Sequence, residues 1–180
     1  MRYFTVDICG RKVDLPILNI GENLNIAFFN LHGAQELTEY CAKHLAPLVS
    51  GCDVVLTAES KGLQLAHCVA RELGQPNYAV ARKSKKLYMQ DGIAATVKSI
   101  TTQNEQTLYL SYADVKLLQG KKVAIIDDVI STGGSLLGLE KLVEMSGGTI
   151  FKKAFVLAEG EAKDRGDIVY LATIPLIKND

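Results

Sequence analysis

Two adjacent carboxylates, Asp127 and Asp128, follow the short apolar run at residues 123–126. A run of this length and composition predicts a buried strand, so both aspartates would stand at its carboxyl end. Ionised carboxylates in that position are costly unless a cation or hydrogen-bond donors meet them. A sugar diol with a bound divalent cation would do so, and the pair therefore predicts a site for a sugar-like ligand.

A glycine-rich turn that could open a helix begins three residues after the acidic pair. Its members are Ser131, Thr132, Gly133, Gly134 and Ser135. A helix N-terminus offers free N–H groups and a positive dipole end, and glycines allow close approach, so the turn suits a phosphate. Taken alone, it is equally consistent with a plain strand-to-helix turn. The carboxylates beside it favour a sugar phosphate, and it is neither a Walker loop nor a dinucleotide fingerprint.

Two further features could hold an anion in a chain whose 20 basic and 20 acidic residues leave no net charge. One is a small-residue turn before another predicted helix, formed by Glu59, Ser60, Lys61 and Gly62. Alone, this turn is more typical of an ordinary helix cap. The other is the basic cluster of Arg82, Lys83, Lys85 and Lys86, which is usually a solvated face but at a strand end could neutralise an anion. With this charge balance, no whole-chain electrostatic argument points to a nucleic-acid or membrane partner, and we expect neither.

Hydrophobic periodicity places these turns between alternating strands and helices. Three- and four-residue spacing predicts helices at 34–49, 62–73 and 135–145. Short apolar runs predict strands at 53–58, 78–81, 108–112, 122–127, 149–157 and 168–173. This order predicts an α/β fold, a parallel twisted sheet with helices on both faces and ligands beyond the carboxyl ends of its strands. Residues 83–106 have no clear period and predict a long loop, as in an active-site lid.

Length and composition set the remaining bounds. A chain of 180 residues with 48% hydrophobic residues predicts one compact domain over residues 1–180. No apolar stretch approaches the roughly 20 residues that cross a bilayer, and no leader-like segment is apparent, so we expect a cytoplasmic protein. The four cysteines have neither zinc-site nor disulfide-scaffold spacing and are expected to be reduced.

The string at residues 123–135 resembles the 5-phosphoribosyl-1-pyrophosphate (PRPP) binding motif of the type I phosphoribosyltransferases: four apolar residues, two acidic ones, three mixed ones, then Thr-Gly-Gly-Ser. The resemblance implies that Asp127 and Asp128 hold the ribose and act in catalysis. Residues 131–135 would wrap the 5′-phosphate. Mg²⁺ would arrive bound to PRPP, with the two aspartates as the residues that could contact it. Pyrophosphate would lie against Glu59, Ser60, Lys61, Gly62, Arg82, Lys83 and Lys86.

The resemblance covers about residues 25–175 and is nearest to the adenine and xanthine phosphoribosyltransferases. It implies a base hood at residues 1–33, a flexible lid at 84–106 that excludes water on closing, and a homodimer. Base contacts would come from Phe28, Phe29, Asn30 and Val129, although core packing explains either phenylalanine equally well. A lid carboxylate that adenine enzymes place near the base aligns with Thr102, and Glu105 follows as the catalytic candidate.

The activity so implied is transfer of the phosphoribosyl group from PRPP to a purine base, giving a nucleoside monophosphate and pyrophosphate. Adenine is the first expectation. Xanthine is an alternative, although the late Glu-Lys pair of the xanthine enzymes is Glu159-Gly160 here. A second alternative is a PRPP-sensing regulator without catalysis, because the fold is reused in that role. Such regulators usually add a nucleic-acid-binding domain or a basic face, for which this chain has little room.

Overall fold

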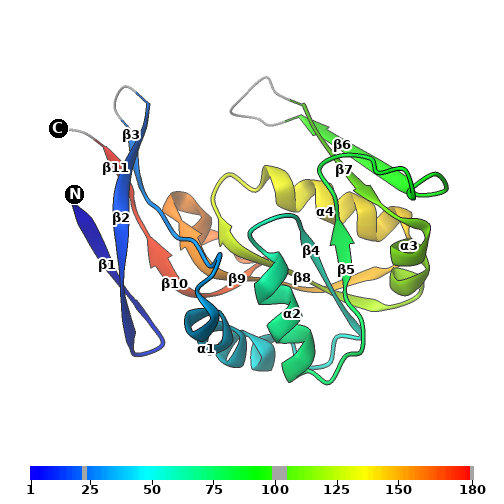
Figure 1. Ribbon diagram of the computed structural model, residues 1–180, viewed down its shortest axis with the longest axis horizontal. Helices are drawn as coiled ribbons and strands as arrows, with labels where there is room; N and C mark the ends of the chain where they lie inside the picture. Colours follow the sequence, from blue (N-terminus) through cyan, green and yellow to red (C-terminus); the bar gives the residue numbers. More distant parts are fainter. Residues whose placement is uncertain (22–23, 99–104, 179–180) are drawn as a thin grey trace.

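A five-stranded parallel sheet forms the centre of the molecule (Figure 1). The computed structural model describes residues 1–21, 24–98 and 105–178. The strand order is β10-β9-β8-β4-β5. The strands are β4 (Val54–Ala58), β5 (Ala79–Ala81), β8 (Lys122–Ile130), β9 (Thr149–Glu159) and β10 (Val169–Ile174). Because all neighbours pair in parallel, the turns after β4, β5, β8 and β9 meet at one edge of the sheet.

Helices cover both faces of this sheet. On one face lie α1 (Gln35–Leu45), with the 3₁₀ turn η1 (Ala46–Val49) after it, and α2 (Leu63–Glu72). On the other face lie α3 (Tyr112–Leu118) and α4 (Gly134–Met145). Side chains of β8 alternate between the two cores: Ala124 and Ile126 join the α1 and α2 side, and Val123 and Ile125 join the α4 side. The predicted α/β class, with helices on both faces of a parallel sheet, is confirmed.

A second, antiparallel sheet stands beside the first, and we call it the hood. Its order is β1-β2-β3-β11. The strands are β1 (Tyr3–Ile8), β2 (Arg11–Gly21), β3 (Leu24–Ala27) and β11 (Leu176–Lys178). Sequence periodicity predicted no strand here. The hood depends on pairing β3 with β11 from the opposite end of the chain, which local patterns do not encode.

The prediction of a long loop at residues 83–106 was wrong for much of that segment. Strands β6 (Ile93–Lys98) and β7 (Glu105–Leu110) form an antiparallel hairpin. Ala95 and Val97 of β6 are buried, and in β7 the buried residues are Leu108 and Leu110. A Cβ atom at Gly138 of α4 would lie 2.9 Å from Cδ1 of Leu108, so the hairpin packs directly on that helix. Because β6 has few large apolar residues, its two-residue alternation is not apparent in the sequence.

Helix α3 was also not predicted, although its start carries a sequence signal. Ser111 and Asp114 form a capping box: the Asp114 N–H donates to Ser111 Oγ, and the Ser111 N–H donates to Asp114 Oδ2. Within the described ranges, no helix has both the length and the apolar character that crossing a membrane requires.

Candidate active site

The acidic pair lies inside β8, in its second half, because the strand continues to Ile130, past the predicted end at residue 127. Asp128 is almost buried, with 5% of the residue's surface exposed. Its Oδ1 accepts a hydrogen bond from the Val129 N–H at 2.9 Å, and Oδ1 of Asp127 accepts one from the Asp128 N–H at 2.9 Å. The second oxygen of Asp128, Oδ2, is buried without a hydrogen-bond partner. A buried acceptor of this kind is costly unless a ligand meets it.

Burial is the main cause that raises the pKa of both carboxyls above the ordinary aspartate range. For Asp127 the neighbouring charge of Asp128 raises the pKa further. For Asp128 the ammonium of Lys61, 3.9 Å away, acts in the opposite direction. The ionised pair is therefore stabilised by a ligand that supplies hydrogen-bond donors or a cation, and the two hydroxyls of a ribose are such donors.

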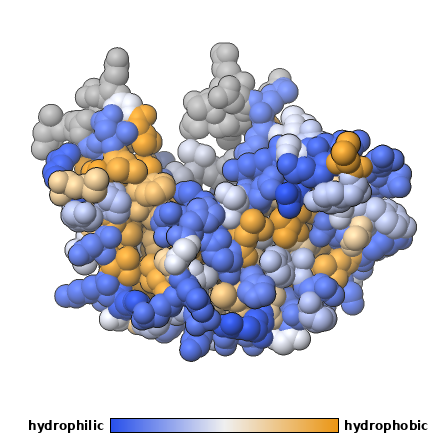
Figure 2. Space-filling view, in the orientation of Figure 1, coloured by the Kyte–Doolittle hydropathy of each residue, from blue (hydrophilic) through white to orange (hydrophobic). Residues whose placement is uncertain are grey.

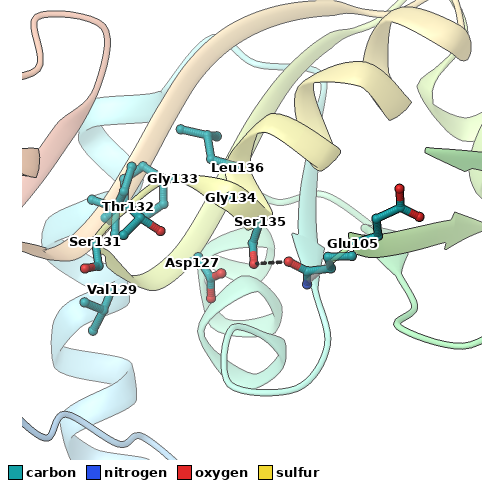
Figure 3. A pocket seen from close by; sticks show the side chains of 12 residues that line it. Glu105, Asp127, Val129, Ser131, Thr132, Gly133, Gly134, Ser135 and Leu136 are labelled. Carbon is teal, nitrogen blue, oxygen red and sulfur yellow. Dashed lines mark hydrogen bonds between the residues drawn. The ribbon is translucent and has the colours of Figure 1, made fainter. Parts of the chain in front are cut away.

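The glycine-rich turn forms the start of α4 and one wall of a cavity of about 330 Å³. Gly133 is the N-cap residue in the left-handed conformation, with φ at +82°, where a side chain would be strained. The cavity is lined by all five residues of the turn, together with Asp127, Val129 and Glu105. Figure 3 shows Asp127 and Ser135 facing the same hollow, with Glu105 across it on β7. The structure thus brings the glycine-rich turn, Asp127 and Glu105 to the same cavity.

The second predicted turn, at residues 59–62, lies between β4 and α2. Gly62 closely approaches the acidic pair, because a Cβ atom there would lie 2.7 Å from Asp127 Oδ1 and 2.2 Å from Thr57 Oγ1. The Glu59–Ser60 peptide bond is cis. The Glu59 carboxylate forms an ion pair with Arg82, with 2.8 Å between Nε and Oε2, and it accepts a hydrogen bond from the Lys83 N–H at 2.6 Å. Glu59 therefore orients the basic cluster and does not itself face an anion.

The members of the basic cluster take different positions. Arg82 follows β5 and is ion-paired with Glu59. The charge of Lys83 lowers the pKa of Asp127, although burial outweighs it. The ammonium of Lys86 donates to Ser84 Oγ at 2.8 Å, farther along the loop. The cluster thus begins beside the acidic pair and continues onto the surface.

The four residues predicted to contact the base lie in different environments. Phe29 is 2% exposed and belongs to the core on the α1 and α2 side, so this assignment is corrected in favour of core packing. Phe28 is half-buried, and its ring lies 4.8 Å from Lys61 Nζ. Asn30 is exposed, and its Oδ1 accepts from the His32 N–H. Val129 lines the cavity beside Asp127. Thr102 lies outside the described residues.

A second cavity, of about 730 Å³, opens between the hood and the sheet edge. Ser131 and Thr132 line both cavities, so the two meet at the glycine-rich turn. Its other walls come from Phe4 and Leu176 of the hood, from residues 173–175 at the end of β10, and from residues 159–164 at the end of β9 and after it. Figure 2 shows a broader hollow between the hood and the part of the surface that carries the β6–β7 hairpin, whose described residues do not line this second cavity.

Comparisons with known proteins agree with this geometry. The model of the phosphoribosyl transferase domain family matches residues 30–176. A xanthine phosphoribosyltransferase of Exiguobacterium sp. (strain AT1b) is 35% identical over 181 residues, covering 95% of this chain and 90% of that protein. A hypoxanthine/guanine phosphoribosyltransferase of Methanothermococcus okinawensis is 31% identical over 134 residues, covering 74% of this chain and 69% of that protein.

The chain belongs to the phosphoribosyltransferase family. It is therefore an enzyme, a pentosyltransferase. Solved structures share the phosphoribosyltransferase fold. The APRTase of Giardia lamblia, complexed with 9-deazaadenine, has a TM-score of 0.68 at 22% identity, over 82% of this chain and 87% of that one. The adenine phosphoribosyltransferase of Thermoanaerobacter pseudethanolicus has a TM-score of 0.63 at 23% identity, over 81% and 83%.

Three site residues of this phosphoribosyltransferase were missed by sequence reasoning. Gln106 accepts a hydrogen bond from Ser135 Oγ at 3.3 Å and so joins the hairpin to the glycine-rich turn (Figure 3). Glu159, 9% exposed, lines the hood cavity at the end of β9. Arg165 approaches Gly133 from outside both cavities. Of the three, only Glu159 could have been proposed from the sequence, because it is a carboxylate near the end of a predicted strand.

Proposed function

We propose that this phosphoribosyltransferase transfers the phosphoribosyl group of PRPP to an amino-bearing purine, adenine first, and releases pyrophosphate. The relatives that support a purine are named as xanthine and hypoxanthine/guanine enzymes. A structural neighbour from Trypanosoma brucei was solved with AMP, pyrophosphate and ribose-5-phosphate. The choice of base rests on the chemistry of the hood cavity.

The carboxylate of Glu159 is the observation that carries this choice. Glu159 lines a cavity that adjoins the glycine-rich turn, and its carboxylate makes no hydrogen bond or ion pair with another described residue. A carboxylate accepts hydrogen bonds and donates none, so it favours a ligand that presents N–H groups. Glu161 and Asp164 add two more carboxylates to the cavity lining, against the single cation of Lys163.

An acidic cavity discriminates between purines by their exocyclic groups. Adenine has an amino group and no carbonyl oxygen, so it brings no oxygen lone pairs near these carboxylates. Guanine also offers N–H donors, with one carbonyl oxygen. Xanthine also has ring N–H donors, but it brings two carbonyl oxygens, whose lone pairs would be repelled by these carboxylates. We therefore expect adenine to be used best and xanthine least.

The remaining residues take the roles that their positions suit. Asp127 and Asp128 would bind the ribose hydroxyls, and the N–H groups and hydroxyls of residues 131–135 would bind the 5′-phosphate. Pyrophosphate would lie at residues 60–62, where Lys61 is present and Glu59 holds Arg82 toward the site. The residues would then align PRPP with the base and stabilise the charge of the departing pyrophosphate. Closing residues 84–106 would exclude water.

Magnesium would be carried by PRPP and would keep several water ligands. The acidic pair fits this arrangement, because Asp128 Oδ2 is a buried oxygen without a hydrogen-bond partner. Among the described residues, no group of three or more His, Cys, Asp or Glu side chains is arranged to hold a metal by itself. Bound with PRPP, the ion would offset the charge of the pyrophosphate. A cytoplasmic homodimer stays a prediction, and sedimentation analysis would test the dimer.

A base panel tests the proposal. The protein is incubated with PRPP, Mg²⁺ and adenine, guanine, hypoxanthine or xanthine, and nucleotide formation gives kcat/KM for each base. We expect adenine to give the highest value. Asp128→Asn is the matched control and should remove the activity, which assigns it to this site. A kcat/KM for xanthine equal to or above that for adenine would contradict the choice of base, and no nucleotide from any base would contradict the reaction.

A further inference from the structure

A guanidinium stands directly behind the glycine-rich turn. A Cβ atom built on Gly133 would lie 2.7 Å from Nη1 of Arg165. The space that a side chain would take at position 133 is therefore occupied by Arg165. Gly133 is thus required twice, by its φ of +82° and by this contact. Arg165 lines neither cavity described above, so it meets the turn from outside the space that these cavities leave for a ligand.

Arg165 is held in place by two parallel hydrogen bonds. Its Nε donates to Asp167 Oδ1 at 3.0 Å, and its Nη2 donates to Asp167 Oδ2 at 2.8 Å. This two-point geometry fixes the plane of the guanidinium as a single ion pair would not. The Arg165 side chain holds the pKa of Asp167 well below its usual range, with Lys153 as the next cause. The nitrogen left over, Nη1, is the one directed at Gly133.

The ion pairs continue from Asp167 back to the helix that the turn begins. The ammonium of Lys153, on β9, donates to Asp167 Oδ2 and also to Glu140 Oε1 at 2.7 Å. Glu140 belongs to α4, whose N-cap residue is Gly133. The chain of contacts thus starts on α4 and returns to its N-terminus through Arg165. Lys153 is only 14% exposed, so water screens this link less than a surface ion pair.

We propose that Arg165, clamped by Asp167, is a positioning residue for the 5′-phosphate of PRPP. It braces Gly133 from behind, so that the N–H groups of residues 131–135 converge on the phosphate, and it adds a fixed positive charge near that dianion. The inference rests on the assignment of residues 131–135 to the 5′-phosphate in the proposed function. A purely structural ion-pair chain would affect unfolding without affecting one part of the ligand more than another.

The test compares ligands that differ in the 5′-phosphate. Calorimetry with the whole protein and Mg²⁺ gives Kd for PRPP, ribose 5-phosphate and pyrophosphate. Arg165→Ala is expected to raise Kd for PRPP and ribose 5-phosphate about tenfold, which is about 1.4 kcal/mol, and to change Kd for pyrophosphate less than twofold. In steady-state assays KM for PRPP should rise equally, with kcat nearly unchanged. Lys152→Ala, which removes an exposed cation from the same strand as Lys153, is the matched control.

Two more variants separate positioning from charge. Asp167→Asn removes the charged partner of Arg165 and should weaken ribose 5-phosphate binding severalfold. Arg165→Lys keeps the charge but cannot form the two-point clamp, so it should restore little of the loss. Wild-type affinity for ribose 5-phosphate in Arg165→Ala, or full recovery in Arg165→Lys, would overturn the inference and leave the proposed function intact. If the wild-type protein bound neither PRPP nor ribose 5-phosphate, that result would contradict the proposed function itself.

Discussion

The ammonium of Lys61 lies 3.9 Å from Oδ2 of Asp128, the buried oxygen that has no hydrogen-bond partner. The same ammonium lies 4.8 Å from the centroid of the Phe28 ring. One cation therefore connects the acidic pair in β8 with the aromatic ring that follows β3 of the hood. In the absence of ligand, Lys61 partly offsets a carboxylate that is otherwise buried without compensation.

Replacing Lys61 with Met is expected to destabilise the unliganded protein in a pH-dependent manner. Lys61 lowers the pKa of Asp128, so its loss disfavours the ionised carboxylate in the folded state. The loss should be absent below about pH 4, where the carboxyl is protonated in both states, and should appear at neutral pH. Because Lys61 is 42% exposed, we expect about 1 kcal/mol or less, or about 2–4 °C in Tm.

Thermal unfolding between pH 4 and pH 8 measures this effect. Lys85→Met removes an exposed cation from the basic cluster and is the control, with an unchanged Tm expected at every pH. An equal loss of Tm in Lys61→Met at pH 4 and pH 8 would mean that the side chain acts through packing, and not through Asp128.

Asp127→Asn is expected to stabilise the unliganded protein while damaging the site. Burial raises the pKa of Asp127, so ionising this carboxyl costs more in the folded state than in the unfolded state. That cost is absent below the ordinary pKa of about 4 and grows as pH rises toward the raised value. Asparagine avoids it. We expect the variant to gain at least about 1 kcal/mol over the wild type at pH 8 and nothing at low pH.

The matched control for Asp127→Asn is Asp91→Asn, which neutralises an exposed carboxylate. Calorimetry should show that Asp127→Asn binds PRPP at least about tenfold more weakly, because a charge-assisted hydrogen bond to the ribose is lost. A variant that was less stable than the wild type at pH 8 would contradict the stated cost of the buried charge.

Gly62→Ala should disturb the acidic pair through a steric conflict. The φ angle of Gly62 is −75°, which alanine adopts freely, so the new methyl group is the whole perturbation. It would meet Thr57 Oγ1 and Asp127 Oδ1. Overpacking of this kind costs about 1–3 kcal/mol, and displacement of Asp127 should raise Kd for PRPP about tenfold or more.

Two further variants are compared with Gly62→Ala. Gly21→Ala is the control, because a Cβ atom there meets nothing within 4 Å. Thr57→Ala combined with Gly62→Ala removes one conflict and leaves the one with Asp127, so Tm should recover more than PRPP affinity does. Parallel recovery of both quantities would show that Asp127 is not the residue displaced.

Glu159→Gln tests the basis of base selection. Glutamine keeps the shape but lacks the charge, and its amide can donate to a carbonyl oxygen. We expect kcat/KM for adenine to fall about tenfold, as befits loss of a charge-assisted hydrogen bond, and the ratio of hypoxanthine to adenine to rise. Glu161→Gln, in the same cavity but exposed, is the control and should change the ratio less than twofold. Unchanged selectivity in Glu159→Gln would remove this residue from base recognition.

Much of the sheet and the acidic pair could be predicted from local patterns. The run that became β8 is apolar on both faces because helices cover both faces, and that burial is written into consecutive residues. The turn at residues 131–135 and the carboxylates before it are also consecutive, so their spacing alone indicated a sugar-phosphate site. Elements that depend on distant partners were not predictable in this way. The hood needs β11 to complete it, and the β6–β7 hairpin needs α4 to cover its few apolar side chains.

The sequence by itself determined the chemistry at the end of β8, because that chemistry resides in adjacent residues of one strand and one turn. Tertiary structure alone decided which of two neighbouring phenylalanines enters the core, since Phe28 and Phe29 differ only in the side of the chain they occupy. It alone set Glu159 at the hood cavity and Arg165 behind Gly133. Such pairs come from separate loops, and only the parallel packing of strands brings those loops to the same edge.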